Sequence, residues 1–278
     1  MHNVHTHTWN ANLHINPATQ RETDLARGYP LDLTVRLEAF LEDMAHFEKV
    51  IVFGLKARRT GYWVPDEYVA EFVAQAPAKL IGFASCDPTQ LGYFDELRHA
   101  CQQLGLRGVK MGPTYAGFDP RDALCDPVYR YCQENGLPIL FHSGTTFNHD
   151  ARLEYSRPWL FDEVAIRYPG LRVVLAHAGH PFSEECLVVI RKHPHVYADL
   201  SALYYRPWQF YNTLIAAQEY GVTHKLLFGT DYPFAQAQAS IQGLRNVNHV
   251  IGESGLPRVS EQVIEEILHR AALSLLGI

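Results

Sequence analysis

Two histidines stand two positions apart in the opening run Asn3-Val4-His5-Thr6-His7. Residues two apart on a β-strand point to the same side, so a strand here would present both imidazoles to one metal ion. The pair alone is weak evidence, because 15 histidines in 278 residues give about 0.8 such pairs by chance. A second pair, His193-Pro194-His195, serves as an internal control. The position of each pair relative to the strands must decide between them.

Three more metal-capable side chains, His142, His177 and Asp231, come where later apolar runs end. Imidazole nitrogens and a carboxylate oxygen are the ligands of catalytic zinc sites, which keep one position open for water. An ion held in this way brings the pKa of a bound water to about 7. The side chains therefore predict one metal site, provided that the fold brings their strand ends together.

Short apolar runs alternate with amphipathic stretches along the whole chain, and this alternation indicates a parallel sheet. The expected strands cover residues 3–7, 49–55, 80–86, 106–111, 137–142, 171–177, 196–200 and 225–229. The expected helices cover residues 33–47, 66–75, 94–104, 127–134, 158–168, 183–192, 207–220 and 235–248, with a ninth over 260–276. Ser260 is the expected N-cap of that last helix.

Eight strand and helix units predict one (β/α)₈ barrel domain over residues 1–278, with an additional C-terminal helix. An open doubly wound sheet is the alternative, but it would normally show a Gly-rich phosphate turn after the first strand, and none occurs here. Catalytic groups of such barrels lie at the C-terminal ends of the strands. All five metal-capable residues fall at that rim, whereas His193 and His195 precede the seventh strand and fall at the opposite one.

Composition excludes several classes of function. The chain is 47% hydrophobic and 19% charged, as in an ordinary globular protein. A net charge of −6 gives no basic field for a nucleic-acid backbone. Five scattered cysteines without a Cys-x-x-Cys pair suggest free thiols in a reducing compartment. Neither a secretory leader nor an apolar run of about 18 residues is found, so we expect a cytoplasmic protein without a membrane partner.

The sequence resembles the amidohydrolase superfamily, in the branch that contains aminocarboxymuconate-semialdehyde decarboxylase and the resorcylate decarboxylases. The resemblance runs nearly end to end. It rests on six motifs: Val4-His5-Thr6-His7, Leu80-Ile81-Gly82-Phe83-Ala84-Ser85-Cys86-Asp87-Pro88, Gly108-Val109-Lys110, Ile139-Leu140-Phe141-His142, Leu175-Ala176-His177-Ala178-Gly179 and Phe228-Gly229-Thr230-Asp231-Tyr232-Pro233. One departure is Arg270-Ala271 in the last helix, where an Asn-Ala pair is common in the family.

The resemblance implies that one divalent ion, most often zinc, is held by His5, His7, His142 and Asp231. It also implies that His177 is a catalytic group beside the ion. Asp231 is suited to take a proton from water, and His177 to polarise the substrate or shuttle a proton. In binuclear relatives a carboxylated lysine on the fourth strand bridges two metals; for Lys110 we expect no bridge.

Substrate choice in this fold depends on the loops after the strands. An arginine there could bind a substrate carboxylate, and a tryptophan could stack on a planar ring. The alternative for an Arg-Arg pair is a solvated surface loop. His180 could line the mouth of the barrel, although a capping role is the stronger expectation. The candidate substrate-binding residues are Trp9, Arg58, Arg59, Trp63, Lys110, His180 and Tyr204.

We expect a metal-dependent hydrolase that uses an activated water on an ester, lactone or amide of a small carboxylic acid. The alternative reaction is non-oxidative decarboxylation of a small aromatic or unsaturated carboxylic acid. A third alternative, from another class of function, is a non-catalytic barrel that binds a metabolite or a metal. The expected partner is a small carboxylate-bearing molecule, and the sequence leaves open whether the chain forms a homodimer.

Overall fold

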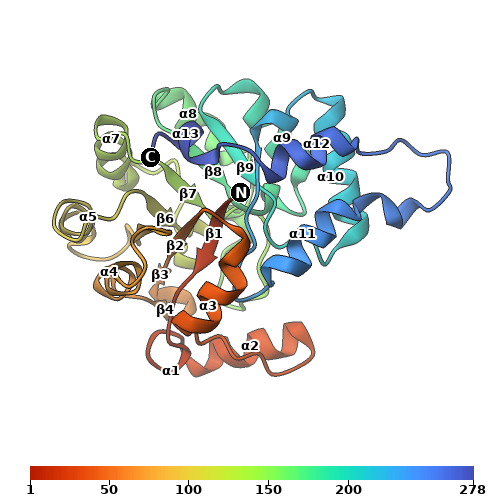
Figure 1. Ribbon diagram of the computed structural model, residues 1–278. Helices are drawn as coiled ribbons and strands as arrows, with labels where there is room; N and C mark the ends of the chain where they lie inside the picture. The colour runs from red at the N-terminus through yellow and green to blue at the C-terminus, as the bar shows by residue number, and fades with distance from the viewer.

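The computed structural model describes residues 1–278, which form a barrel of eight parallel strands (Figure 1). Neighbouring strands in the sheet follow the chain order β1-β2-β5-β6-β7-β8-β9-β10, and each successive pair is parallel. The strands are β1 His2–His7, β2 Lys49–Phe53, β5 Leu80–Cys86, β6 Val109–Met111, β7 Ile139–Phe141, β8 Val173–Leu175, β9 Val196–Asp199 and β10 Leu226–Leu227.

The chain closes the barrel between its first strand and the segment after β10. Val4 N donates to Phe228 O at 3.0 Å, and Asp231 N donates to His5 O at 2.9 Å. Thr6 and Tyr232 form a further parallel bridge. These contacts place Asp231 directly beside His5 and confirm the (β/α)₈ barrel, or TIM barrel, predicted from the sequence.

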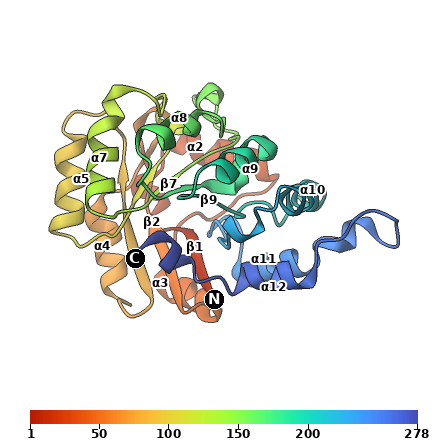
Figure 2. The ribbon, with the colours of Figure 1, turned by 90° about the horizontal axis from the view of Figure 1, so that it is seen from above.

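Helices surround the strands on the outside of the barrel, as the two orthogonal views show (Figures 1 and 2). They are α1 Ala11–His14, α2 Pro17–Arg27, α3 Leu37–Asp43, α4 Asp66–Ala74, α5 Tyr93–Gln102, α6 Pro113–Ala116, α7 Asp126–Glu134, α8 Leu160–Arg167, α9 Ser183–Lys192, α10 Pro207–Glu219, α11 Ala237–Arg245, α12 Glu261–Leu268 and α13 Ala272–Leu276. None of them combines the length and apolarity that crossing a membrane requires. The five cysteines are free thiols.

Short 3₁₀ turns continue or connect several of these elements. They cover Met44–His46, Arg58–Thr60, Ala123–Cys125, Leu153–Tyr155, Ala176–Gly179, Thr223–Lys225 and Val247–Ile251. The expected helix over residues 260–276 is broken between α12 and α13. Ser260 caps its start, since Val263 N donates to Ser260 Oγ at 3.2 Å. Arg270 lies in the break and donates to the carbonyls of Leu226 and Thr223, which ties the C-terminal segment to the barrel.

The apolar core has two layers because strand residues alternate in direction. Val4, Ile51, Phe53, Leu140 and Val174 belong to the cluster that fills the barrel, and each is at most 1% exposed. The larger cluster of 63 residues packs the outer face of the strands against the helices. A filled interior leaves the rim at the C-terminal strand ends as the place where polar side chains can meet.

The long connection from β1 to α3 contains two helices that the sequence reading missed. Asn16 caps α2 by accepting from Ala18 N at 2.8 Å, and Pro17 stands at its first position. Gly28 ends the helix in the left-handed region, with φ at 77°. All three signals are visible in the sequence. The connection after β2 also holds an unpredicted hairpin, formed by β3 Lys56–Ala57 and β4 Tyr62–Trp63.

Candidate metal centre

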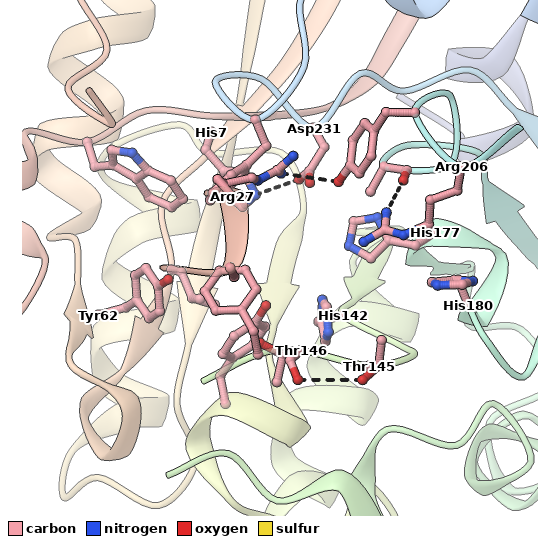
Figure 3. A pocket seen from close by; sticks show the side chains of 18 of the residues that line it. His7, Arg27, Tyr62, His142, Thr145, Thr146, His177, His180, Arg206 and Asp231 are labelled. Atoms are coloured by element: carbon pink, nitrogen blue, oxygen red, sulfur yellow. Dashed lines mark hydrogen bonds and ion pairs between the residues drawn. The ribbon is translucent and has the colours of Figure 1, made fainter. Parts of the chain in front are cut away.

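Four strand ends bring the predicted metal-capable side chains to one end of the barrel. His5 and His7 come from β1, His142 directly follows β7, His177 follows β8, and Asp231 follows β10. All five are buried, with 9% or less of each residue exposed. Figure 3 shows His7, His142, His177 and Asp231 around the same space. The barrel therefore assembles the cluster that the sequence pattern predicted.

Asp231 is the centre of the contacts. Its Oδ1 lies 3.3 Å from Nε2 of His5 and 3.3 Å from Nε2 of His7. His5, His177 and Asp231 each offer one ligand atom, and these atoms all lie within 4.8 Å of one another. The ring of His142 is 5.1 Å from that of His177. This arrangement makes a metal site plausible at His5, His177 and Asp231, while the exact ligand set stays a prediction.

A second carboxylate, Asp199 at the end of β9, lies behind the cluster. Its Oδ2 accepts from His5 Nδ1 at 2.8 Å, and its Oδ1 accepts from the backbone N–H groups of His177 at 3.1 Å and Ser201 at 3.0 Å. The hydroxyl of Ser201 also donates to Oδ1. Sequence reasoning missed Asp199, although a carboxylate that ends the run Val196-Tyr197-Ala198 was a visible signal.

Backbone strain is concentrated at the same rim. The four residues other than glycine with positive φ are His177, Ala178, Ala202 and Asp231, with φ of 57°, 45°, 60° and 66°. They follow β8, β9 and β10, where the chain leaves the barrel. Left-handed conformations at such residues cost about 1–2 kcal/mol each and cluster at functional sites. Here they turn His177 and Asp231 toward the cavity.

Burial keeps most of the imidazoles neutral. It lowers the pKa of His7 to about 3 and the pKa of His177 to about 4, and it holds the pKa of His142 well below its usual value. His5 differs: burial and Lys110 lower its pKa, but Asp199 and Asp231 outweigh both, so the pKa is raised. A pKa raised by two carboxylates marks His5 as the imidazole that most readily holds a proton.

Asp231 stays ionised. Burial alone would raise the pKa of its carboxyl, but the imidazoles of His5 and His7, whose Nε2 atoms each lie 3.3 Å from Oδ1, hold that pKa well below the usual range. The pKa of Asp199 is also lowered, because His5 and Ser201 outweigh its burial. Two buried carboxylates thus carry negative charge beside a group of imidazoles.

The donor set fits a divalent cation. His5 Nε2 and His142 Nε2 are buried and have no hydrogen-bond partner. Buried polar atoms are normally satisfied, so unpartnered imidazole nitrogens around an ionised carboxylate require an explanation. Nitrogen and oxygen donors of this kind suit zinc and related divalent ions. Asp199 behind His5 supplies the carboxylate–histidine contact that accompanies most metal-binding imidazoles.

A cavity of about 660 Å³ opens above this cluster (Figure 3). Its wall combines aromatic and cationic side chains. Trp9 stacks on His7, with ring centroids 4.4 Å apart. The guanidinium groups of Arg27 and Arg206 lie 4.7 Å and 4.5 Å from the ring of Tyr205. The lining also includes Leu55, Tyr62, Lys110, Tyr115, Thr145, Thr146, Phe147, His180 and Phe234.

Neither cavity arginine has a carboxylate partner. Arg27 donates to the hydroxyl of Tyr205 at 3.1 Å, and Arg206 donates to the carbonyl of Ala202. Their remaining N–H groups are available to an anion. Arg27 was not predicted from the sequence, because it is the last residue of α2, the unpredicted helix in the connection after β1. Arg206, by contrast, lies in the connection that follows β9, at the N-cap of α10.

The candidate substrate residues fall into two groups. Trp9, Lys110 and His180 line the cavity. Lys110 is buried, and its Nζ lies 4.8 Å from the ring centroid of Phe53. Burial lowers the pKa of Lys110 to about 8, with Asp199 and Asp231 acting in the opposite direction. His180 is partly buried, and burial followed by Arg206 lowers its pKa to about 4.

Arg58, Arg59, Trp63 and Tyr204 do not line the cavity, and this corrects the sequence-based expectation. The β3–β4 hairpin carries Trp63 and Arg58 to a separate hollow, where the guanidinium lies 3.7 Å from the indole. Arg59 donates to Asp150 O at 2.7 Å, and Tyr204 donates to Gly229 O at 2.9 Å. For Arg58, Arg59 and Trp63 the unpredicted hairpin determines the position of the side chain, whereas Tyr204 lies between β9 and α10.

Fold and site together define a metal-dependent enzyme of the amidohydrolase superfamily. The chain belongs to the amidohydrolase family, whose model matches residues 3–278.

Comparison with individual proteins gives more distant matches. A 2-amino-3-carboxymuconate-6-semialdehyde decarboxylase from Dictyostelium discoideum is 27% identical over 150 residues, which is 44% of this chain and 42% of that protein. A probable 2-pyrone-4,6-dicarboxylic acid hydrolase from Acinetobacter baumannii, with citric acid bound, superposes with a TM-score of 0.70 at 16% identity, covering 100% of this chain and 99% of the other. A dihydroxybenzoic acid decarboxylase from Polaromonas, with manganese and 2-nitroresorcinol bound, gives 0.63 at 16% identity, covering 99% and 96%.

Proposed function

We propose that the chain is a metal-dependent, non-oxidative decarboxylase of a small aromatic or unsaturated carboxylic acid. The observation that carries the proposal is the cavity, in which an ionised Asp231 among buried imidazoles faces a wall of aromatic rings and arginines without carboxylate partners. The decarboxylase from Dictyostelium supports this reaction over the hydrolysis that we preferred from the sequence.

The wall of the cavity suits a planar anion. Trp9, Tyr62, Tyr115, Phe147 and Phe234 offer ring surfaces on which an aromatic or conjugated substrate can stack. The free N–H groups of the two cavity arginines can hold a carboxylate, and charge-assisted pairs of this kind are about twice as strong as neutral hydrogen bonds.

In the proposed reaction a proton is added to the carbon that bears the carboxylate. The bond between that carbon and the carboxylate then breaks, its electron pair stays on the carbon, and carbon dioxide leaves. Asp231 faces the cavity with one carboxylate edge held by His5 and His7, so its other oxygen can carry the proton from solvent to the carbon. A divalent ion bound by the cluster would supply a Lewis acid that polarises a substrate oxygen.

Hydrolysis is the second candidate, and one observation favours it. The carboxyl of Asp231 has a pKa well below its usual range, so the free protein presents it as a base and not as an acid. A base beside a Lewis acid can take a proton from water during attack on an ester, lactone or amide carbon. Both reactions use the same residues, which is why they must be separated by isotope tracing.

The test uses the metal-loaded protein with a panel of aromatic and unsaturated carboxylic acids, and with esters, lactones and amides of similar size. Decarboxylation in D₂O should release carbon dioxide and leave deuterium on the product carbon. Hydrolysis in H₂¹⁸O would instead place ¹⁸O in a newly formed carboxylate. Chelated protein and an Asp231→Asn variant are the controls. Uptake of ¹⁸O without carbon dioxide release would reject the decarboxylase and establish the second candidate.

A further inference from the structure

Ser201 contacts the candidate cluster through a hydroxyl group that does not titrate near neutral pH. It follows Asp199 by two residues, lies fully buried, and its hydroxyl reaches three groups. These are the carboxylate of Asp199, Nδ1 of His177 at 2.8 Å and Nδ1 of His5 at 3.2 Å. The backbone carbonyl of Ser201 also lies 3.2 Å from Nδ1 of His177.

The proton positions in this network follow from the donor inventory. A carboxylate only accepts, so the single Ser201 O–H proton must be donated to Asp199 at their short separation. If that proton pointed toward His177 instead, lone pairs on Ser201 Oγ and Asp199 Oδ1 would face each other. The Ser201 oxygen is then an acceptor toward His177, and so is the Ser201 carbonyl. Both therefore require the His177 ring proton to be on Nδ1.

The backbone makes this arrangement rigid. Asp199 Oδ1 accepts from the N–H groups of both His177 and Ser201, so it fixes the segments that follow β8 and β9 against each other. His177 and Ala202, which adjoin these contacts, have φ of 57° and 60°. Neither the ring of His177 nor the hydroxyl of Ser201 can turn away without breaking several buried hydrogen bonds.

We propose that Ser201 is a positioning residue that holds His177 in the Nδ1–H tautomer, so that Nε2 presents a lone pair. The neutral ring then cannot donate a hydrogen bond from Nε2. It can accept a proton from an O–H group of the substrate or of water, or donate its lone pair to a cation. This narrows the sequence-based role, which left open whether His177 polarises the substrate or shuttles a proton.

The tautomer is independent of the reaction, while its effect on turnover rests on the proposed function. NMR of the full-length protein with ¹⁵N-labelled histidine reads the tautomer directly from the ring nitrogen shifts, and His177→Asn assigns the signal. We expect a protonated Nδ1 and an unprotonated Nε2 in the wild type. Ser201→Ala removes the acceptor at 2.8 Å and keeps only the backbone carbonyl at 3.2 Å, so the Nε2–H tautomer should become populated beside the Nδ1–H tautomer. Ser143→Ala is the matched control, because Ser143 is an equally buried rim serine that donates to Ala176 O at 2.8 Å and does not contact His177.

Turnover gives a second readout once a substrate is known. Ser201→Ala should lower kcat by roughly 10- to 100-fold with little change in KM, as for other residues that orient a functional histidine. Ser201→Thr, which keeps the hydroxyl, should restore the wild-type tautomer. A wild-type His177 protonated on Nε2 would overturn the proposal, and so would a Ser201→Ala variant whose tautomer matches that of Ser143→Ala. Absence of turnover on every substrate would count against the proposed function and leave the NMR result standing.

Discussion

Asp199 accepts a hydrogen bond from Nδ1 of His5 at 2.8 Å, and neither side chain is accessible to solvent. This contact places the His5 proton on Nδ1 and leaves Nε2 directed toward Asp231, 3.3 Å away. Outer contacts of this kind orient metal-binding imidazoles and raise their basicity. The carboxylate behind the cluster is therefore as important to the expected metal site as the side chains in front.

Replacement of Asp199 by Asn should weaken metal binding by about 10- to 100-fold. The amide either turns its oxygen to His5 and its NH₂ toward the N–H groups of His177 and Ser201, or the reverse. The first arrangement leaves backbone donors unpaired, and the second forces the His5 proton onto Nε2. Competition titration with a chelator measures the affinity. A variant that binds the ion as tightly as the wild type contradicts this role.

Metal binding should weaken as the pH falls, with about one proton in competition above pH 5. The pKa of His5 is raised, so this imidazole is protonated first on acidification and must lose its proton to the ion. The pKa values of about 4 for His177 and about 3 for His7 leave those rings neutral over the same range. Calorimetry in buffers of different ionisation enthalpy counts the protons released. Release of two or more at pH 6 would contradict the assignment.

Lys110 should act in substrate binding and not as a bridge between two metals. Its Nζ lies over the ring of Phe53, and a pKa of about 8 leaves a mostly protonated ammonium at pH 7. We expect Lys110→Met to keep one ion per chain, to unfold no more readily than the wild type, and to raise KM for a carboxylate substrate about tenfold. Elemental analysis and steady-state kinetics measure these quantities. Two ions in the wild type, with one lost in the variant, would establish the bridge.

The strand-end residues could be predicted because their positions depend on one regular feature. Once the chain is read as eight strand and helix units, His142, His177 and Asp231 must meet His5 at the C-terminal rim. Asp199 ends β9 at the same rim, so the same rule predicts it as part of the site. The rule says nothing about the connections, where a helix end, a cap or a short hairpin determines the direction of a side chain. For that reason Arg27, which was not predicted, lines the cavity, whereas Arg58, which was predicted to bind substrate, lies outside it.

Arg206, in the cavity, and Arg58, outside it, make a matched pair of arginines for mutation. Arg206→Ala should raise KM for a carboxylate substrate by roughly 10- to 100-fold, because a charged hydrogen bond is worth about 1.5–3 kcal/mol. Arg58→Ala should leave KM unchanged, because its guanidinium stacks on Trp63 in a separate hollow. Both variants remove one positive charge, so general electrostatic attraction cancels in the comparison. Equal increases in KM would show that recognition depends on net charge and not on the cavity wall.

Gly144 follows β7 closely and supports the cavity without contributing a side chain. Its φ is +88°, and an added Cβ would overlap the carbonyl oxygen of His180. Gly144 N donates to Ser156 O at 2.6 Å, and Thr145 N donates to that same His180 carbonyl at 2.7 Å. A methyl group here must therefore push apart two loops whose residues Thr145 and His180 line the cavity.

Gly144→Ala should lower the free energy of unfolding by more than about 2 kcal/mol, since left-handed strain alone costs about 1–2 kcal/mol and a backbone clash adds to it. Gly136→Ala is the control, because Gly136 has a φ of +66° and open space around the added Cβ. Gly136→Ala should lower the free energy of unfolding only by the cost of the left-handed backbone conformation. Urea denaturation of both variants isolates the clash as the difference between them. The clash should also raise KM in Gly144→Ala but not in Gly136→Ala, because it displaces His180 and Thr145. Equal losses of stability and equal KM values in the two variants would mean that the loops adjust without cost.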